Sequence, residues 1–164
     1  MTKFSIHTAQ DLLDQKQSAM VTVSHDTIIK DAIQSMVTSK VGAILVTKNQ
    51  EIVGIWTERD LLRNSLTPDF DLDRSRIESY MVAPVIGVPS DTPLIKLEEM
   101  FVGLYIRHIL VTKDGKPAGL LSIGDVMRAS LLNQDQKIKE LNRMVSWEYY
   151  ENWGWKGNEK KNKK

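Results

Sequence analysis

The apolar positions of this chain follow two different periods, and the changes between them predict short strands and helices. Val21–Val23 is a short β-prone run, and the apolar residues after it recur at helical spacing, with Asp26 and Thr27 placed to cap that helix. Val41–Thr47 is a short run rich in β-branched residues that predicts a buried strand. The polar residues 48–51 then predict a hairpin turn into a second strand. The apolar positions of the helix are Ile29, Ala32, Ile33, Met36 and Val37.

A glycine, a hydroxyl and an aspartate mark the junction between this second strand and the next helix. Residues 52–56 form the apolar run of the strand, Gly54 lies within it, and Thr57 and Asp60 follow at three-residue steps. Strand-to-helix junctions of this kind present backbone amides and polar side chains to ligands. The predicted order of elements within the unit is therefore strand, helix, strand, strand, helix.

The whole unit occurs twice. A shift of 65 positions aligns Val23–Arg63 with Val88–Arg128 without a gap, and the glycine, hydroxyl and aspartate recur as Gly119, Ser122 and Asp125. A repeat of this length predicts two copies of one supersecondary unit that pack on each other and bury a shared face. The identical pairs are Val23/Val88, Asp26/Asp91, Thr27/Thr92, Val37/Val102, Ile44/Ile109, Leu45/Leu110, Val46/Val111, Thr47/Thr112, Lys48/Lys113, Gly54/Gly119, Asp60/Asp125 and Arg63/Arg128.

The composition is ordinary for a soluble globular protein. A chain of 164 residues with 41% hydrophobic content suits one compact domain or two small, closely paired ones. No apolar run approaches the roughly 20 residues that span a membrane, and the N-terminus lacks the apolar core of a signal peptide. The absence of cysteine excludes disulfides, thiolate nucleophiles and zinc–thiolate sites. These features predict a cytoplasmic protein with no membrane association.

The net charge of +1 hides an uneven distribution. Residues 156–164 hold five lysines against one acid, which leaves residues 1–155 with 17 basic and 20 acidic side chains. This mildly acidic balance argues against a nucleic-acid-binding surface. An aromatic cluster lies between the predicted C-terminal helix and the lysines. Such clusters dock on a protein partner, on a second subunit or on their own chain. The cluster comprises Trp147, Tyr149, Tyr150, Trp153 and Trp155.

Repeated β-α-β-β-α units that end in Gly-h-x-Thr/Ser-x-x-Asp-h, with h apolar, resemble tandem CBS domains, the Bateman module. The residues Val41-Gly-Ala-Ile-Leu-Val, Ile106-Arg-His-Ile-Leu-Val and Thr57-Glu-Arg-Asp-Leu are typical of that family. The resemblance covers roughly Met20–Leu66 and Ile77–Leu131. It implies an α/β (α+β) fold in which two repeats pack with pseudo-two-fold symmetry, here with a C-terminal helical extension. It also implies a regulatory module, not an enzyme, that binds adenosine nucleotides between repeats, forms flat homodimers and acts on a partner protein.

The resemblance and the composition together divide the chain. A polar stretch with a proline, Ser65–Arg76, separates the two repeats and predicts a connector. We therefore expect a lead-in helix over 1–19, the first repeat over 20–66, a linker over 67–76, the second repeat over 77–131, the C-terminal helix and aromatic segment over 132–155, and a disordered lysine-rich tail over 156–164.

The hydroxyl–aspartate pairs have two interpretations. A hydroxyl at a helix N-cap with an acid three residues on is a capping box, which stabilises a helix without any ligand. Capping boxes favour Glu or Gln at the acidic position, however, and both repeats carry aspartate. The resemblance assigns the aspartate to the ribose diol and the hydroxyl to phosphate or ribose oxygens. A carboxylate suits a diol, because it can accept both hydroxyl protons.

The two copies differ beside the motif. Glu58 and Arg59 of the first copy are replaced by Ile123 and Gly124 in the second. We therefore expect ligand contact at Asp60 before its counterpart in the second repeat.

Adenine needs an apolar slot with backbone groups at its edge. The family pattern implies that the backbones around Thr22 and Gly42 supply it in the first site, and those around Val88 and Arg107 in the second. Arg107 offers a planar fork for phosphate, and His108 fits either a phosphate-facing or a purely structural role. The expected ligand-binding residues are Thr22, Val23, Gly42, Ala43, Ile44, Gly54, Thr57, Arg59, Asp60, Val88, Arg107, His108, Ile109, Gly119, Ser122 and Asp125.

The ligand implied by the resemblance is AMP, ADP or ATP, with no covalent cofactor. S-adenosylmethionine and NAD(H) are alternatives, and so is a ligand-free dimerisation scaffold. The three histidines are too scattered in sequence to predict a metal site. An enzyme using Asp60 or Asp125 as a base is disfavoured, because neither has a nucleophile or metal cluster beside it. Trp56 could stack on a base, but its place in a buried strand favours core packing.

Overall fold

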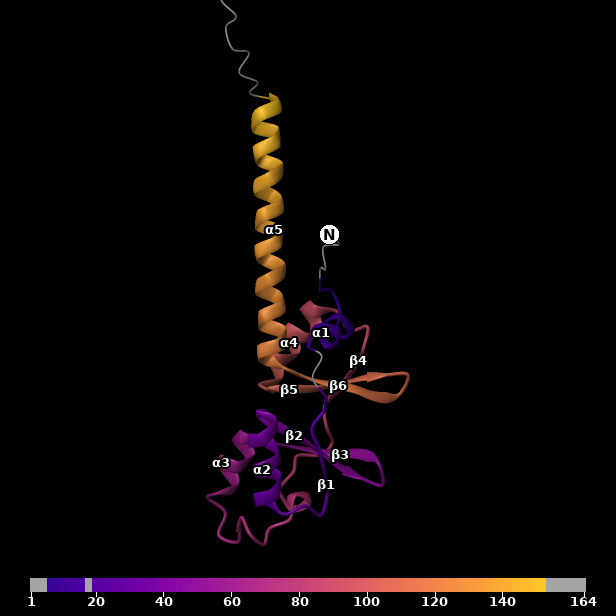
Figure 1. Ribbon diagram of the computed structural model, residues 1–164, viewed down its shortest axis with the longest axis vertical. Coiled ribbons are helices and arrows are strands. Elements are labelled where there is room, and N and C mark those ends of the chain that lie inside the picture. The colour runs from indigo at the N-terminus through magenta and orange to yellow at the C-terminus, as the bar shows by residue number, and fades with distance from the viewer. Residues whose placement is uncertain (1–5, 17–18, 153–164) are drawn as a thin grey trace, which may run out of the picture.

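The computed structural model describes residues 6–16 and 19–152, and Figure 1 shows two similar units stacked on each other. Each unit has a three-stranded sheet and two helices, which confirms the predicted mixed fold. The first unit comprises β1 (Thr22–Ser24), α2 (Ile29–Ser39), β2 (Ala43–Lys48), β3 (Glu51–Thr57) and α3 (Glu58–Asn64). The second comprises β4 (Gly87–Pro89), α4 (Leu94–Leu104), β5 (His108–Lys113), β6 (Lys116–Ser122) and α5 (Ile123–Asn152). Helix α1 (Ala9–Lys16) precedes both, and a 3-10 turn, Ile77–Ser79, lies between them.

The two sheets have the same topology and register. In the first, β1 pairs parallel with β2 and β2 pairs antiparallel with β3, and β4, β5 and β6 repeat this order. Both antiparallel pairs shift register at the same place, between Val46 and Thr47 and between Val111 and Thr112. The predicted order of strand, helix, strand, strand, helix is confirmed in both copies.

Both predicted hairpin turns are present and have left-handed backbone at their two central residues. The φ angles are 52° at Asn49 and 68° at Gln50 in the first unit, and 51° at Asp114 and 73° at Gly115 in the second. Two-residue turns with positive φ at both positions match the right-handed twist of the flanking strands. The turns therefore fix the register of β2 with β3 and of β5 with β6.

Helix α2 does not begin with the cap that the sequence suggested. Its N-cap is Ile28, which has no side-chain capping bond, so the expected cap by Asp26 and Thr27 is wrong. Backbone carbonyls of the connector take this role, because the Ile29 and Lys30 amides donate to Ser75 O and Leu72 O, at 2.9 and 3.0 Å. The connector thus folds over the start of α2 and satisfies amides that a helix leaves unpaired.

The segment that leads into each unit packs on the other unit. Residues 75–82 lead into the second unit but pack on the first, where Ile77 N donates to Thr27 O at 2.9 Å. Residues 6–16 lead into the first unit but pack on the second, where Ala9 N donates to Thr92 O at the same distance. Thr27 and Thr92 are equivalent in the repeat, so the two contacts are copies of each other. This exchange ties the units together through backbone hydrogen bonds.

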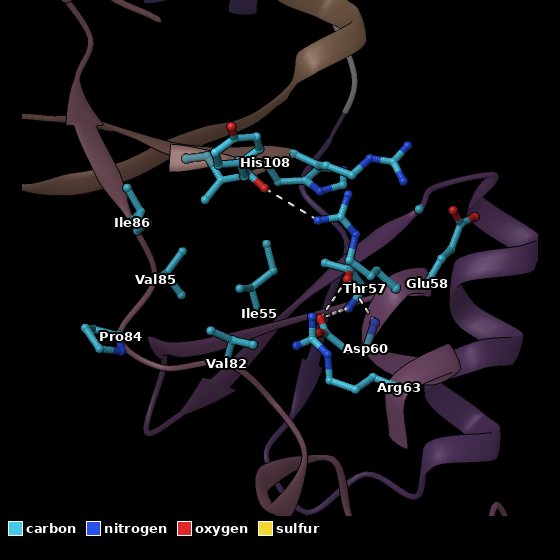
Figure 2. A pocket seen from close by; sticks show the side chains of 15 residues that line it. Ile55, Thr57, Glu58, Asp60, Arg63, Val82, Pro84, Val85, Ile86 and His108 are labelled. Atoms are coloured by element: carbon cyan, nitrogen blue, oxygen red, sulfur yellow. Dashed lines mark hydrogen bonds and ion pairs between the residues drawn. The ribbon is translucent and has the colours of Figure 1, made fainter. Parts of the chain in front are cut away.

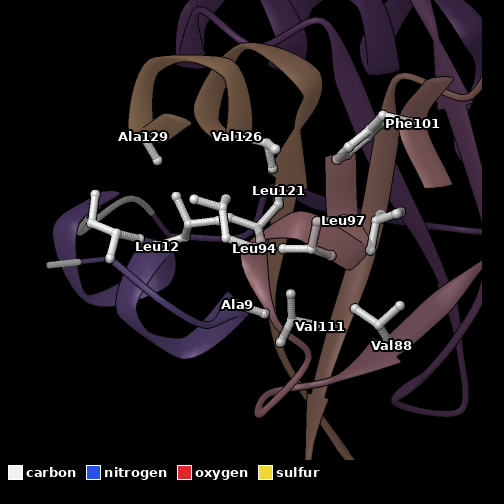
Figure 3. Packing of buried hydrophobic residues seen from close by; sticks show 12 residues of the cluster. Ala9, Leu12, Val88, Leu94, Leu97, Phe101, Val111, Leu121, Val126 and Ala129 are labelled. Atoms are coloured by element: carbon white, nitrogen blue, oxygen red, sulfur yellow. The ribbon is translucent and has the colours of Figure 1, made fainter. Parts of the chain in front are cut away.

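Each unit has its own hydrophobic core, and the exchanged segments complete it. Figure 3 shows Ala9 and Leu12 of α1 beside Leu97, Leu121 and Val126 of the second unit. The first core contains Ile77, which has no exposed surface. Residues 77–82 thus complete the first core before the chain enters the second unit. The first core comprises Ile29, Ala32, Met36, Ile44, Val46, Trp56 and Ile77.

Helix α5 extends far beyond the body of the molecule (Figure 1). Its 30 residues give it a length of about 45 Å, and the C-terminal helical extension is thereby confirmed. Leu131, Ile138 and Leu141 are exposed along it. The side chains of residues 145–152, and all of 153–164, lie outside the described residues, and with them the aromatic cluster and the lysine tail. Within the described part of the chain, no helix has both the length and the apolar character to cross a membrane.

Candidate functional site

Two cavities lie where the units meet, and each combines the strand-to-helix junction of one unit with the helix-to-strand loop of the other. The first, cleft 1, has a volume of about 450 Å³, and the second, cleft 2, about 340 Å³. Cleft 1 is lined by Gly42, Ile55, Thr57, Glu58, Arg59, Asp60, Arg63, Val82, Pro84, Val85, Ile86, Tyr105, Ile106, Arg107 and His108. Cleft 2 is lined by Lys16, Ala19, Met20, Val21, Ser39, Lys40, Val41, Gly42, Ala43, His108, Leu120, Ser122 and Asp125.

The carboxylate of cleft 1 caps the helix behind it. Thr57 N and Thr57 Oγ1 donate to Asp60 Oδ2 at 3.0 and 2.6 Å, and Asp60 N donates to Thr57 Oγ1 at 3.3 Å. The capping-box interpretation is therefore confirmed for this pair. These bonds use one carboxylate oxygen, and the other, Oδ1, lies 3.5 Å from Arg63 Nη1. Capping thus leaves one oxygen of a carboxylate that lines the cleft, so the two interpretations are compatible.

The second copy has the same local geometry. Ser122 N and Ser122 Oγ both donate to Asp125 Oδ2 at 2.8 Å, and Asp125 N donates to Ser122 Oγ at 3.2 Å. The repeated hydroxyl–aspartate pair is thus a repeated capping structure, placed at equivalent positions in the two clefts.

Cleft 1 has an apolar side and a charged side. Figure 2 shows Ile55, Val82, Val85 and Ile86 on one side of the cavity and Asp60 with its neighbours on the other. Three arginines and one further acid complete the lining, so its ionised side chains carry a net charge of +1 with a neutral histidine. The arginines are Arg59, Arg63 and Arg107, and the further acid is Glu58.

Two of these arginines come from different units. Arg59, at the start of α3, donates from Nη1 to the carbonyl of Tyr105 at 3.5 Å, across the boundary between the units. Arg107 lies in the loop before β5 and approaches from the second unit. The side of the cleft that carries Asp60 is therefore surrounded by guanidinium groups from both halves of the chain.

A lysine enters cleft 2. Lys16 Nζ donates to Asp125 Oδ2 at 2.8 Å and to the Leu120 carbonyl at 2.9 Å. Burial raises the pKa of Asp125, but the hydrogen bonds from Lys16 and Ser122 outweigh it and hold that pKa below its ordinary value. The Asp125 carboxylate is therefore ionised and paired.

His108 lies between the two clefts and lines both. Burial, followed by the nearby charges of Arg107 and Lys16, lowers its pKa to about 4, although Asp125 and Asp60 oppose the shift. Its Nδ1 is buried and has no hydrogen-bond partner among the described residues. The imidazole is therefore neutral at physiological pH.

Most of the expected site residues line one of the two clefts, and each cleft combines residues from both units. Asp60 shares cleft 1 with Arg107 and His108, whereas Asp125 shares cleft 2 with Ala43. The expected grouping of residues 42–44 with Asp60, within one repeat, is wrong for Ala43. The reason is the facing arrangement of the units, which directs the loop before β2 toward the junction of the second unit. The members of cleft 1 are Gly42, Thr57, Arg59, Asp60, Arg107 and His108, and those of cleft 2 are Gly42, Ala43, His108, Ser122 and Asp125.

The remaining expected residues line neither cleft. Ile44 and Ile109 have no exposed surface and belong to the two cores. Gly54 and Gly119 lie beneath the exchanged lead-in segments. Thr22 on β1 is exposed, Val23 on β1 packs against the first core, and Val88 on β4 belongs to the second core.

Sequence reasoning missed the wall residues that flank these strands. Val85 and Ile86 precede β4 in cleft 1, and Met20 and Val21 precede β1 in cleft 2. Val85 and Ile86 lie 65 positions after Met20 and Val21, so the internal repeat could have identified both pairs as equivalent wall residues. In the described ranges 6–16 and 19–152, no group of His, Asp and Glu side chains is placed to hold a metal ion.

Comparisons with known proteins agree with this architecture. The model of the CBS domain family matches residues 10–67 and 77–132. A mitochondrial CBS domain-containing protein of Arabidopsis thaliana is 32% identical over 129 residues, which cover 76% of this chain and 63% of that protein. The chain thus spans less than two thirds of that relative's length.

Two solved structures share the fold. A CBS-domain containing protein from Agrobacterium tumefaciens aligns with a TM-score of 0.73 and 30% identity, over 79% of this chain and 98% of the other. A CBS domain protein from Pyrobaculum aerophilum, complexed with AMP, aligns with a TM-score of 0.63 and 24% identity, over 72% and 88%. The chain therefore belongs to the CBS domain family and carries two CBS domains in tandem.

Proposed function

We propose that this CBS domain pair is a regulatory module that binds an adenine nucleotide in cleft 1 and transmits its presence to a partner protein. The observation that carries the proposal is the Asp60 carboxylate, which is 7% exposed, lines the cavity, and has an oxygen that the capping box does not use. An apolar wall lies opposite it and three arginines surround it. These three features correspond to the ribose, the base and the phosphates of one nucleotide.

The apolar wall suits the base. Ile55, Val82, Val85 and Ile86 offer a surface against which a planar ring can pack, and the neighbouring backbone offers polar groups to its edge. A volume of about 450 Å³ falls within the ordinary range of small-molecule sites. The cavity therefore has room for a nucleotide.

The carboxylate suits the ribose diol, because Asp60 Oδ1 can accept a hydroxyl proton while Oδ2 retains its capping bonds. Arg59, Arg63 and Arg107 suit the phosphates, since guanidinium groups bind phosphate oxygens through paired N–H donors. The same positive charge disfavours the cationic S-adenosylmethionine relative to AMP, ADP or ATP. The AMP bound to the related fold from Pyrobaculum aerophilum supports this assignment.

The transmission step needs a surface that a partner can contact. Leu131, Ile138 and Leu141 are exposed on α5, and their spacing of seven and three residues places them on one face of the helix. We expect this face to pair with a second copy of the chain, in keeping with the predicted homodimer, and the aromatic segment after it to reach a protein partner. The ligand acts by favouring one arrangement of the units over another. A cytoplasmic location stays a prediction.

The test is calorimetric titration of the full chain with AMP, ATP and S-adenosylmethionine. We expect wild type to bind AMP or ATP more tightly than S-adenosylmethionine, and Asp60→Asn to weaken nucleotide binding at least tenfold. The matched control is Asp125→Asn, which changes the equivalent capping residue of cleft 2 and is expected to leave binding unchanged. Failure of wild type to bind any adenine nucleotide would refute the proposal and favour the ligand-free scaffold.

A further inference from the structure

The two clefts differ at one position that decides what can reach the carboxylate. In the first unit, the carbonyl of Ile55 accepts a hydrogen bond from the backbone amide of Val82 at 2.8 Å. In the second unit, the equivalent carbonyl of Leu120 accepts from the side chain of Lys16 at 2.9 Å. An apolar wall residue of cleft 1 is thus replaced by an ammonium group in cleft 2.

Lys16 is held in this position by the helix that ends with it. Helix α1 is anchored on the second unit, where Ala9 is fully buried and Leu12 nearly so. Ile6, just before the helix, exchanges two hydrogen bonds with Asn133, whose Oδ1 accepts from Ile6 N at 3.2 Å and whose Nδ2 donates to Ile6 O at 2.6 Å. The position of Lys16 is therefore fixed by packing along the whole of α1.

We propose that Lys16 is an internal occupant of cleft 2, which blocks the ribose diol from Asp125 and limits the chain to one nucleotide, bound in cleft 1. The inference rests on the function proposed above. It makes Lys16 the residue that distinguishes two clefts built from the same repeat.

The geometry supports the block in two ways. Asp125 Oδ2 already accepts three hydrogen bonds, two from Ser122 and one from Lys16, so the carboxylate is neutralised by a cation that Asp60 lacks at the equivalent place. The ammonium also occupies the space over the end of β6, between the Leu120 carbonyl and the carboxylate. Lys16 leaves Asp125 Oδ1 unbonded, so the block acts through the neutralised charge of the carboxylate and through the position of the ammonium beside it. A diol that displaced the ammonium would leave the charge of a partly buried lysine unpaired.

Cleft 2 also lacks two of the three arginines of cleft 1. Gly124 stands where the first unit has Arg59, and Gly42 stands where the second unit has Arg107. Of the three guanidinium groups, cleft 2 thus retains only the counterpart of Arg63, Arg128, whose Nη1 lies 3.9 Å from Asp125 Oδ1, and its carboxylate is already paired with Lys16.

The test measures how many AMP molecules bind to the full chain, by calorimetry at saturating AMP. We expect one per chain for wild type and two for Lys16→Met, which keeps the aliphatic stem and removes the charge. Adding Asp125→Asn to Lys16→Met should return the number to one. Lys139→Met is the matched control, because Lys139 pairs with Asp135 at 2.6 Å on the exposed surface of α5 and far from either carboxylate in sequence. It should leave the number at one.

Several results would overturn the inference. Wild type binding two AMP molecules, or Lys16→Met still binding one, would show that Lys16 does not block cleft 2. Loss of the wild-type site in Lys16→Met would show instead that Lys16 contacts the ligand. Lys16→Gln is the second variant if Lys16→Met does not fold, and the same numbers apply to it. Absence of binding by wild type to AMP and ATP alike would refute the proposed function as well, whereas the other results leave that function standing.

Discussion

A Cβ atom on Gly119 would lie 2.4 Å from Cδ2 of Leu13, because α1 packs directly on strand β6. Gly54 has the same relation to Met81, whose Sδ would lie 2.3 Å from the added atom. Both glycines belong to the repeated motif, and both lie under the lead-in segment that comes from the other unit. The glycine of the motif is therefore required by close packing between exchanged segments, independently of any ligand.

Substitution of these glycines is expected to destabilise the protein. Gly119→Ala should lower the free energy of unfolding by about 1–3 kcal/mol, because the branched end of Leu13 must move. Gly54→Ala should cost less, since the thioether of Met81 adapts more easily. Urea unfolding measures both. Gly103→Ala is the control: it has open space around its Cβ in the last turn of α4 and should not destabilise the protein.

The double variant Gly119→Ala with Leu13→Ala sharpens this test. If the clash with Leu13 is the cause, Gly119→Ala should cost much less in the Leu13→Ala background than in wild type. An equal cost in both backgrounds would mean that the backbone of β6 itself needs the glycine.

Local pattern was enough to predict the elements and their repetition, because those depend on neighbours in sequence. The apolar run at residues 41–47 became β2, and the predicted hairpin turn formed after it and again, 65 positions later, at Asp114–Gly115. The start of α2 could not be predicted in this way. Its amides are satisfied by carbonyls of Leu72 and Ser75, more than 40 residues away in sequence.

The candidate site was only half predictable for the same reason. The motif identified Asp60 and Asp125, which depend on local capping geometry. The residues that face each carboxylate across its cleft come from the other unit, and a repeat in sequence does not state how its copies face each other. Lys16 lies outside the repeat altogether, so no internal comparison pointed to it.

At the second central position of the two hairpin turns, adding a glycine should stabilise the protein and removing one should destabilise it. Gln50 has a φ of 68°, which costs a residue with a Cβ about 1 kcal/mol, whereas the equivalent position in the second unit is Gly115. Gln50→Gly should therefore raise the free energy of unfolding by about 0.5 kcal/mol, after the larger entropy of glycine in the unfolded chain is subtracted. Gly115→Ala should lower it by about 1 kcal/mol, although no atom lies within 4 Å of its added Cβ. Thermal or urea unfolding compares them, and a stabilising Gly115→Ala would contradict the argument.

Trp56 should depend on a single polar partner. Its indole N–H donates to Asn64 Oδ1 at 3.0 Å, and the side chain is completely buried, which confirms the expected core packing. Asn64→Ala, which copies the equivalent Ala129, should cost about 1–3 kcal/mol by leaving the indole N–H unpaired. The same substitution should cost much less in a Trp56→Phe background, where no donor remains. A double-mutant cycle in urea measures the difference, and additive costs would mean that the hydrogen bond contributes nothing.

His108 should make the stability of the protein depend on pH. The pKa of this imidazole is about 4 in the folded chain and about 6.5 in the unfolded chain, so the unfolded chain binds the proton first as the pH falls. Stability is therefore full above about pH 6.5 and is lost as the pH falls from about 6.5 toward 4, by on the order of 2 kcal/mol once partial solvent exposure is allowed for. His108→Ala, which copies the equivalent Ala43, removes this loss. Urea unfolding at pH 7.5 and 4.5 tests it. The carboxylates titrate in both proteins, so an equally steep loss in His108→Ala would assign the pH dependence to them and not to the histidine between the clefts.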